Sequence, residues 1–423
     1  MKRIFFVFAC VMLFSFLNAQ SDWNDIQFTD HVYVDGIESI TFQAGNYALS
    51  DPITTLGGEP LTLEFDDLEE ESRYLKYTII HCTHDWQPSD LNPIEYINGF
   101  SEDIIDRYNY SFNTIQHYMR YSVTFPNENL SPAISGNYII FVYDDTPDNP
   151  ILTRRFMILE NSQVGITGDV HASSEVADRF TKQEVDFSVS CGSYIIRNPA
   201  MTLHATIKQN GRWDNAIYGL TYRSGYPGEF SFDYDNGQNT FPGGAEFRTF
   251  DLRTLRSNGD RVVGINFDHH RNQAYILQDD ARPFSAYESR STNNGACIYR
   301  NIDIPHDYSE DYVYTHFTLK SSFPFTDGDV YVFGQLTDWQ IKPEAKLVFN
   351  EQYNFWETDF PVKQGIYNYQ YVYVPHGSTE IDATYIEGSH YETRNLYTIF
   401  IYFREEGGSY DKLIGVKRIK AWE

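Results

Sequence analysis

Aromatic residues, arranged in short alternating runs, constrain the fold of this chain more than any other feature. Tyr, Phe and Trp make up 17% of the 423 residues, and alanine-rich helical stretches are missing. Aromatic and β-branched side chains suit the half-buried face of a sheet, and clusters of Gly, Pro, Asn and Asp separate the runs as turns do. The pattern predicts an all-β protein of tandem antiparallel, immunoglobulin-like β-sandwiches. We expect strands at 61–65, 74–82, 118–125, 137–143, 152–160, 184–189, 202–208, 261–267 and 311–319.

The first residues have the organisation of a secretory signal peptide. Lys2 and Arg3 precede an apolar run over 4–17, and Ala19 offers a small residue for cleavage. Cys10 lies inside the apolar run, which argues against a lipoprotein. No later stretch reaches the roughly 18 apolar residues that a membrane-spanning helix needs. We therefore expect a signal peptide at 1–19 and a mature chain exported to the periplasm.

Changes in polarity divide the mature chain into three expected sandwiches. A short polar hinge at 161–163 follows the strand at 152–160, and a Ser/Thr/Asn/Gly loop occupies 291–295. The sequence shows no strict internal repeat, so any kinship among the sandwiches is architectural. The expected domains cover 20–160, 161–290 and 305–423.

The charge of the chain excludes two classes of partner. It has 32 basic and 59 acidic residues, a net charge of −27 that becomes −29 once Lys2 and Arg3 are removed. Nucleic acid and anionic membrane surfaces are poor partners for such a protein. The acidic clusters at 66–71 and 144–145 are expected at hairpin turns, and neither has the alternating ligands of a calcium loop.

The cysteines do not form a disulfide framework. Without Cys10, the odd number Cys82, Cys191 and Cys297 remains, spread over more than two hundred residues. Two alternatives stay open: one bridge, or three buried cysteines that act as small apolar residues.

The segment 77–100 concentrates residues that could suggest a metal site. It contains His81, Cys82, His84 and two aspartates. Alternate side chains of a strand face opposite ways, so His81 and His84 should diverge. Pro88 and Pro93 argue against a helix nearby. We interpret the segment as a structural strand and loop, and expect no metal.

Catalytic motifs are equally lacking in the sequence. It has no Gly-x-Ser-x-Gly elbow, no phosphate-binding glycine loop and no His-Glu-x-x-His. His269 and His270 follow Asp268 in what reads as a solvated loop. We expect no cofactor and no enzymatic activity.

The last domain carries a pattern of its own. Residues 330–339, 353–356 and 365–373 resemble early-set immunoglobulin-like modules related to glycogen-binding domains. That resemblance makes Trp339 and Trp356 candidates for glucan binding, with packing of both rings inside the protein as the alternative. The tyrosines at 367, 369, 371 and 373 share one strand face, which suits either a sandwich core or a partner-binding strip.

A wider set of motifs resembles one family across nearly the whole mature chain. These motifs lie at 77–100, 110–113, 123–128, 135–138, 143–145, 152–156, 209–215, 243–248, 337–339, 382–391 and 410–415. Together they resemble the type IX secretion system Plug family of Bacteroidetes, long catalogued as a domain of unknown function. The resemblance implies a periplasmic protein that docks on the giant outer-membrane β-barrel translocon and blocks its periplasmic mouth when no cargo is engaged. Cys191 and Cys297 belong to no motif of that family, which leaves a bridge between them in doubt.

The resemblance assigns no contact residue, so candidates for an interaction surface come from composition. Aromatic and arginine side chains are enriched at interface centres. The loops that hold Trp86 and the pair Arg212 and Trp213 are therefore candidate interaction sites, beside Trp339 and Trp356. The alternative function is that of an exported β-sandwich protein that binds glucan.

Overall fold

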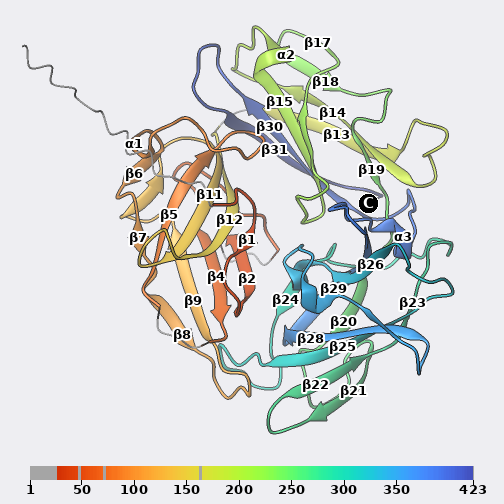
Figure 1. The fold of residues 1–423 in the computed structure, drawn as a ribbon. Coiled ribbons are helices and arrows are strands. Elements are labelled where there is room, and N and C mark those ends of the chain that lie inside the picture. The colour runs from red at the N-terminus through yellow and green to blue at the C-terminus, as the bar shows by residue number, and fades with distance from the viewer. Residues whose placement is uncertain (1–25, 46–48, 70–72, 162–163, 423) are drawn as a thin grey trace, which may run out of the picture.

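The computed structural model describes residues 26–45, 49–69, 73–161 and 164–422. These residues form three β-sandwich units with only short helices between strands (Figure 1). The all-β prediction with antiparallel sheets is confirmed. The expected signal peptide and Cys10 lie outside the described residues. None of the helices in the described part of the chain has the length and apolar character needed to cross a bilayer.

The first unit is a sandwich of two sheets with a short helix at its edge. Its elements are β1 (His31–Val32), β2 (Ile37–Ala44), β3 (Ile53–Thr55), β4 (Leu61–Asp67), β5 (Leu75–Cys82), α1 (Pro93–Tyr96), β6 (Ile97–Gly99), β7 (Asp103–Ile104), β8 (Arg107–Tyr110), β9 (Met119–Phe125), β10 (Leu130–Pro132), β11 (Gly136–Asp144) and β12 (Pro150–Leu159). One sheet has the order β2-β4-β9-β8, and the other contains β12-β11-β5-β7. Alternation along the strands builds the core between them, because every second side chain faces inward.

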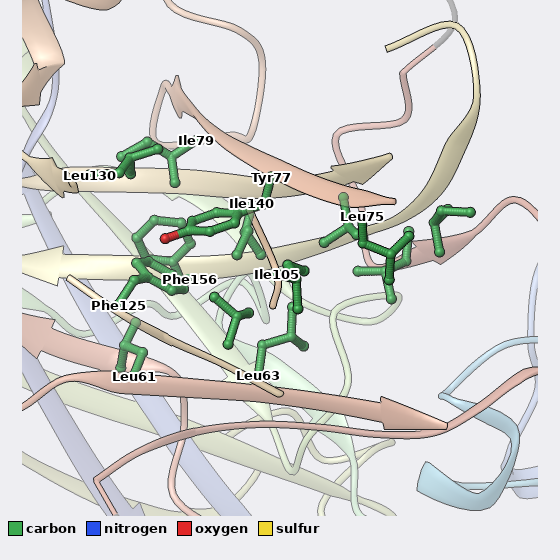
Figure 2. Packing of buried hydrophobic residues seen from close by; sticks show 14 of the residues in the cluster. Leu61, Leu63, Leu75, Tyr77, Ile79, Ile105, Phe125, Leu130, Ile140 and Phe156 are labelled. Carbon is green, nitrogen blue, oxygen red and sulfur yellow. The ribbon is translucent and has the colours of Figure 1, made fainter. Parts of the chain in front are cut away.

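Figure 2 shows this core, where Leu61 and Leu63 of β4 face Tyr77 and Ile79 of β5. The opposite face of β5 is also buried, since Ile80 and Cys82 belong to smaller apolar clusters on that side. A strand buried on both faces reads as a nearly continuous apolar run. This explains the run Tyr77–Cys82 that the sequence showed.

The second unit combines the middle of the chain with its last two strands. Its elements are β13 (Gly165–Ala172), β14 (Lys182–Ser190), α2 (Pro199–Thr202), β15 (Leu203–Gln209), β16 (Ile217–Leu220), β17 (Ser224–Tyr226), β18 (Glu229–Phe232), β19 (Thr240–Pro242), β30 (Leu396–Phe403) and β31 (Lys412–Lys420). β30 pairs with β15 over seven residue pairs, from Leu203 opposite Phe403 to Gln209 opposite Tyr397. β31 also meets β12 in parallel at Leu159 and Leu413, so one sheet continues from the first unit into the second.

The third unit is inserted between β19 and β30 of the second. Its elements are β20 (Arg248–Asp251), β21 (Val262–Phe267), β22 (Asn272–Ile276), β23 (Asp279–Asp280), β24 (Cys297–Tyr299), β25 (Tyr312–Lys320), β26 (Gly328–Phe333), η1 (Gln335–Thr337), η2 (Pro343–Ala345), β27 (Val348–Asn350), β28 (Phe355–Lys363), β29 (Gly365–Pro375) and α3 (Thr384–Glu387). The long strand β29 pairs with β20, β24 and β26. One apolar core joins Phe250 of β20 to Tyr369 of β29, so the unit starts well before 305.

The observed pairing therefore divides the chain differently from the expected boundaries at 290 and 305. Strands β20 to β24 join the third unit, and β30 and β31 join the second. The reason is physical: pairing between strands almost two hundred residues apart leaves no local trace in composition. The expected hinge at 161–163 lies mostly outside the described residues.

The structure tests two further predictions from the sequence. A one-turn helix, α1, begins at Pro93, so the expectation that prolines exclude helix near this point is wrong. Proline is tolerated at the first helical position, and Asn92 and Glu95 form a capping box around it. Cys82, Cys191 and Cys297 are each buried and free, which confirms the second alternative.

Candidate functional site where the three units meet

A cleft of about 420 Å³ lies between the three units and is lined by residues from each. The first unit contributes Asp51 and Arg155, the second contributes Lys208 and Trp213, and the third contributes Trp339. It is lined by two of the five candidate interaction residues, Trp213 and Trp339. The structure therefore brings these two candidate residues together in one cleft.

Two of the candidate tryptophans meet around one arginine. Trp86 and Trp213 pack edge to face with ring centroids 5.2 Å apart. The Arg155 guanidinium lies 4.7 Å from the Trp86 ring and 5.3 Å from the Trp213 ring, and Nη2 donates to the Phe28 carbonyl at 3.0 Å. Cation–π contacts of this kind strengthen when they are removed from water. The stack ties the first unit to the second, and Trp86, 2% exposed, is inside it.

The charge of the cleft contrasts with that of the chain. The whole chain has a net charge of −27. The lining of the cleft contains five basic residues, Arg154, Arg155, Lys208, Arg418 and Lys420, and three acidic ones, Asp30, Asp51 and Asp338. Most of this charge is used in ion pairs between units. Asp51 accepts from Lys208 at 2.9 Å and from Arg418 at 2.7 Å, and Arg154 reaches Asp338 at 2.6 Å.

The pKa of Asp51 indicates that its ion pairs are favourable. Burial opposes its ionisation, but Lys208 and Arg418 outweigh burial and lower the pKa of Asp51 below its ordinary value. Lys208 also lies 4.7 Å from the Trp213 ring. Charge and aromatic contacts thus act together at the junction of the first two units.

The three other candidate residues, Arg212, Trp339 and Trp356, also pack against other side chains of this protein. Arg212 is 5% exposed, forms a bidentate pair with Asp214 and covers the ring of Phe333 at 5.1 Å. The Trp339 ring packs against Phe333, with centroids 5.6 Å apart. Gly295 lies against the same ring so closely that an added Cβ would come within 2.2 Å of it.

Trp356 lies away from the cleft, in the third unit. Its ring packs between Phe325 at 4.9 Å and Phe349 at 5.2 Å. The tyrosines of β29 are buried in the core, since Tyr367, Tyr369 and Tyr371 are at most 1% exposed. The interpretation of that strip as sandwich core is confirmed.

A buried aspartate joins the first unit to the third. Asp66 is fully buried and accepts from Arg120 at 3.0 Å, Lys363 at 2.6 Å and the Tyr312 hydroxyl at 2.7 Å. Lys363 comes from β28, and burial is the main cause that lowers its pKa. The placement of Asp66 in a hairpin turn is therefore wrong, because Asp66 lies in β4 and its carboxylate pairs with Arg120 and Lys363 inside the protein.

A second aspartate, Asp411, joins the loop after β5 to the second unit. It accepts from the His84 backbone nitrogen at 3.0 Å, from its ring Nδ1 at 3.2 Å and from Arg404 at 2.7 Å. Burial opposes ionisation, yet these bonds hold the pKa of Asp411 well below its usual range. His84 lies in the turn after β5 and its ring stacks on His204, whereas the His81 ring is buried against Tyr138.

The third unit contains its own buried charge cluster. Arg248 donates to Glu387 at 3.0 Å and to Asp279 at 2.6 Å, and Arg282 donates to Glu387 at 2.6 Å. Burial opposes ionisation, but Arg248 and Arg282 lower the pKa of Glu387 to about 2. Tyr369 also donates to Asp279 at 2.6 Å. These partners are all satisfied within the unit, which indicates a structural role.

Sequence reasoning missed these buried acids and one further, partly buried cluster. Acidic residues inside alternating apolar strands, such as Asp66 after Phe65, were the available signal. His171, Glu184 and Asp186 also come within 4.8 Å of one another, the one group of potential metal ligands found in the described residues. His269 and His270 lie exposed in a loop, as predicted.

The sequence and the fold of this chain were compared with those of known proteins. Residues 37–160, the first unit, match the family model described as type 9 secretion system plug protein 1st domain. None of the curated protein sequences matches this chain significantly.

Among solved structures, the chain is similar to a hypothetical protein from Parabacteroides merdae. The two share 32% identity with a TM-score of 0.88, over 93% of this chain and 100% of the other. A second match, the ectodomain of a teleost fish polymeric Ig receptor, has 14% identity over 49% of this chain and 87% of its own. Its TM-score of 0.14 is too low for a structural or functional comparison. The family match covers the unit that contributes Asp66, Trp86 and Arg155 to the contacts described above. By this first-domain match, within a fold shared over nearly the full length with the Parabacteroides protein, the chain belongs to the type 9 secretion system plug protein family.

Proposed function

We propose that this chain is the periplasmic plug of the type 9 secretion translocon. It covers the periplasmic opening of the giant outer-membrane barrel when no cargo is in transit. Family membership supports a role associated with type 9 secretion and with the cell envelope, and the family is non-enzymatic in kind. That the protein blocks the barrel is our own proposal and goes beyond this role.

The observation that carries the proposal is the way the three units are locked together. The buried pair of Asp66 with Lys363 joins the first unit to the third. Two further pairs, Asp51 with Lys208 and His84 with Asp411, are partly buried and join the first unit to the second. Breaking one partner of a buried pair is costly because the other charge is left uncompensated. A cover over a pore must keep its shape, and these contacts make three sandwiches behave as one body.

The surface proposed to dock is the outer edge of the first unit, formed by α1 and the strands β6, β7 and β8. Figure 1 shows α1, β6 and β7 along the side of the first unit that faces away from the other two, and β8 at the lower end of that unit, near the third. Ile94, Phe100 and Tyr110 are 87%, 68% and 63% exposed there, and Ile104 and Tyr108 are also exposed. Exposed apolar side chains that gather on one side mark interaction surfaces.

Strand edges at the same place add a second argument. β8 ends the sheet β2-β4-β9-β8, and β7 ends the larger sheet after β5. Edge strands present unpaired N–H and C=O groups that another chain can pair with. A barrel made of strands, with periplasmic turns at its rim, is a chemically suitable partner for this edge.

The test is recovery of the translocon from the native bacterium. Affinity-tagged protein is expressed in place of the original, and detergent-solubilised outer membranes are passed over the resin. We expect a very large outer-membrane barrel among the recovered proteins. The double variant Ile94→Asp/Phe100→Asp should recover about 10-fold less of it, since two buried apolar anchors are worth at least ~1.4 kcal/mol together.

A matched control separates the edge from a general effect of added charge. Phe284 is 94% exposed in a loop of the third unit, and Phe284→Asp should recover the barrel at the original level. Failure of the original protein to recover any barrel overturns the plug proposal. Equal recovery by the double variant overturns only the assignment of the docking edge.

Glucan binding, the alternative function, has less support. Trp339 packs against Phe333 and Gly295, and Trp356 packs between Phe325 and Phe349. A sugar needs an open ring face on which its C–H groups can pack. The packing of both rings favours their role in holding the third unit together.

A further inference from the structure

A group of potential metal ligands lies on one face of the hairpin β13–β14. His171 of β13 stands directly opposite Glu184 of β14, and Asp186 follows two residues later on the same face. One nitrogen or oxygen from each lies within 4.8 Å of the others, and His171 Nε2 is 2.6 Å from Asp186 Oδ2. Ligands of one ion at about 2.1 Å are separated by about 3 to 4 Å, so small side-chain movements bring all three to one centre.

Negative charge accumulates at this face without a matching lysine or arginine. The register places Asp169 directly opposite Asp186, and like charges in that position destabilise a sheet. Glu184 is only 2% exposed and accepts from the Ser174 backbone nitrogen at 2.7 Å. Among the described residues, His171 is the one basic side chain paired with Glu184 or Asp186 within 4.0 Å. A divalent cation would remove this imbalance.

A buried amide beside the cluster adds an independent observation. Asn239 is fully buried, and its Nδ2 donates to Asp186 Oδ1 at 2.8 Å and to the Val185 carbonyl at 2.8 Å. Its Oδ1, on the same amide group, has no hydrogen-bond partner. An unpaired buried acceptor costs roughly 1–3 kcal/mol, and its side chain lies directly against the carboxylate of Asp186. Such a site has an excess of oxygen lone pairs, which is what a cation requires.

We propose that His171, Glu184 and Asp186 bind one divalent cation of the zinc class. One imidazole nitrogen with two carboxylate oxygens is a mixed set that suits zinc or manganese, whereas calcium and magnesium prefer oxygen alone. His171 and Asp186 are partly exposed, so an ion can reach the site from solvent. Three protein ligands leave a further position for water or for Asp169.

The site lies at a junction, which gives the ion a structural consequence. Gln183, next to Glu184, donates to the Tyr391 carbonyl at 2.6 Å and to the Thr393 carbonyl at 2.6 Å. That segment leads from the third unit back into β30. An ion held by β13 and β14 therefore braces the strand that contacts the return of the chain, and it should raise the midpoint of thermal unfolding.

The experiment titrates tag-free mature protein, stripped with EDTA, with zinc chloride. We expect one bound equivalent, a higher thermal midpoint and an affinity that falls as pH is lowered. Metal binding requires a deprotonated imidazole nitrogen and ionised carboxylates, so protons compete with zinc for these ligands.

Variants identify the ligands. His171→Ala and Glu184→Gln should each weaken zinc binding at least about 10-fold. His376→Ala is the matched control, because His376 faces Asp329 at 3.6 Å as a surface histidine–carboxylate pair, and it should bind zinc normally. Absence of stoichiometric binding by the original protein overturns the proposal, as does unchanged binding by both ligand variants.

Cobalt(II) tests the unaltered protein, should the variants fail to fold. The bound ion should show visible absorption distinct from that of hydrated cobalt(II), and one equivalent of zinc should abolish it. A spectrum identical to that of the hydrated ion overturns the site.

Discussion

The buried histidine His81 contributes to a dependence of stability on pH. It is 1% exposed, lies against Tyr138 and reaches the Ser135 carbonyl at 3.4 Å. Burial is the main cause that lowers its pKa to about 4, with Arg404 acting in the same direction and Ser135 and Asp411 opposing. The unfolded ring has a pKa near 6.5, so between these values the unfolded chain binds more protons. Stability should therefore fall by up to about 3 kcal/mol as pH falls from 6.5 to 4.

The variant His81→Phe should flatten this dependence, because it removes the titrating ring and keeps the aromatic packing. Unfolding free energies from urea titrations at several values between pH 7 and 4.5 give the slope. His270→Gln, in an exposed loop, should keep the original slope. An undiminished slope in His81→Phe would show that other groups carry the dependence.

A second side chain, Asp66, stabilises the junction between the first and third units. Asp66→Asn should cost about 3–5 kcal/mol of unfolding free energy, because Lys363 keeps a buried charge without a counter-ion and Arg120 keeps only its pair with the partly exposed Glu64. Asp145→Asn, at a surface ion pair with Lys76 of 3.9 Å, should change stability by less than about 0.5 kcal/mol.

Adding Lys363→Met to Asp66→Asn should recover part of the loss, since it removes one of the unpaired charges. Urea unfolding followed by tryptophan fluorescence measures all three variants. A loss below about 1 kcal/mol in Asp66→Asn would mean that water replaces the carboxylate at the junction.

Two strands at the end of the chain, β30 and β31, complete the second unit. Tyr397, Ile399 and Ile401 supply core contacts to strands that precede them by about two hundred residues. A chain ended after residue 395 should therefore lose the packing of the second unit while the first unit keeps its own core. Limited proteolysis should cut within 165–242 and spare a fragment near 26–160. A chain ended after Ala421 is the control, and equal resistance of both chains would contradict this role.

Local pattern was sufficient to predict nine of the 31 strands of the described chain to within two residues. β5, expected at 74–82, spans Leu75–Cys82, and β25, expected at 311–319, spans Tyr312–Lys320. Alternation and turn residues determine such elements locally. Pairing of β30 with β15 depends on contacts far apart in the sequence, and therefore the insertion of the third unit could not be predicted.

The contacts between units were the least predictable part. Trp86 and Trp213 were identified as notable residues, but their meeting around Arg155 depends on how two units dock. Asp66 looked like a turn residue because its partners Lys363 and Tyr312 lie about 250 to 300 residues away. The cluster of His171 and Glu184 arises only once the register of a hairpin is known.

The whole molecule is a single acidic body in which charged contacts connect every unit. Five of its basic side chains line the central cleft, and its apolar outer edge lies on the first unit. A net charge of −27 favours solubility when the protein is free, while an apolar edge of limited size allows contact that can be reversed. These are the properties that a removable cover needs.

Loss of the protein from its native cell should therefore make the outer membrane leak. In a strain whose translocon is left without cargo, deletion should increase sensitivity to antibiotics too large for ordinary porins, measured as a lower inhibitory concentration. The original gene and Phe284→Asp should restore resistance, whereas Ile94→Asp/Phe100→Asp should not, because it removes the edge by which we propose the cover is held. Unchanged sensitivity in the deletion strain would contradict a sealing role, and restoration by the double variant would show that another surface of this rigid body closes the pore.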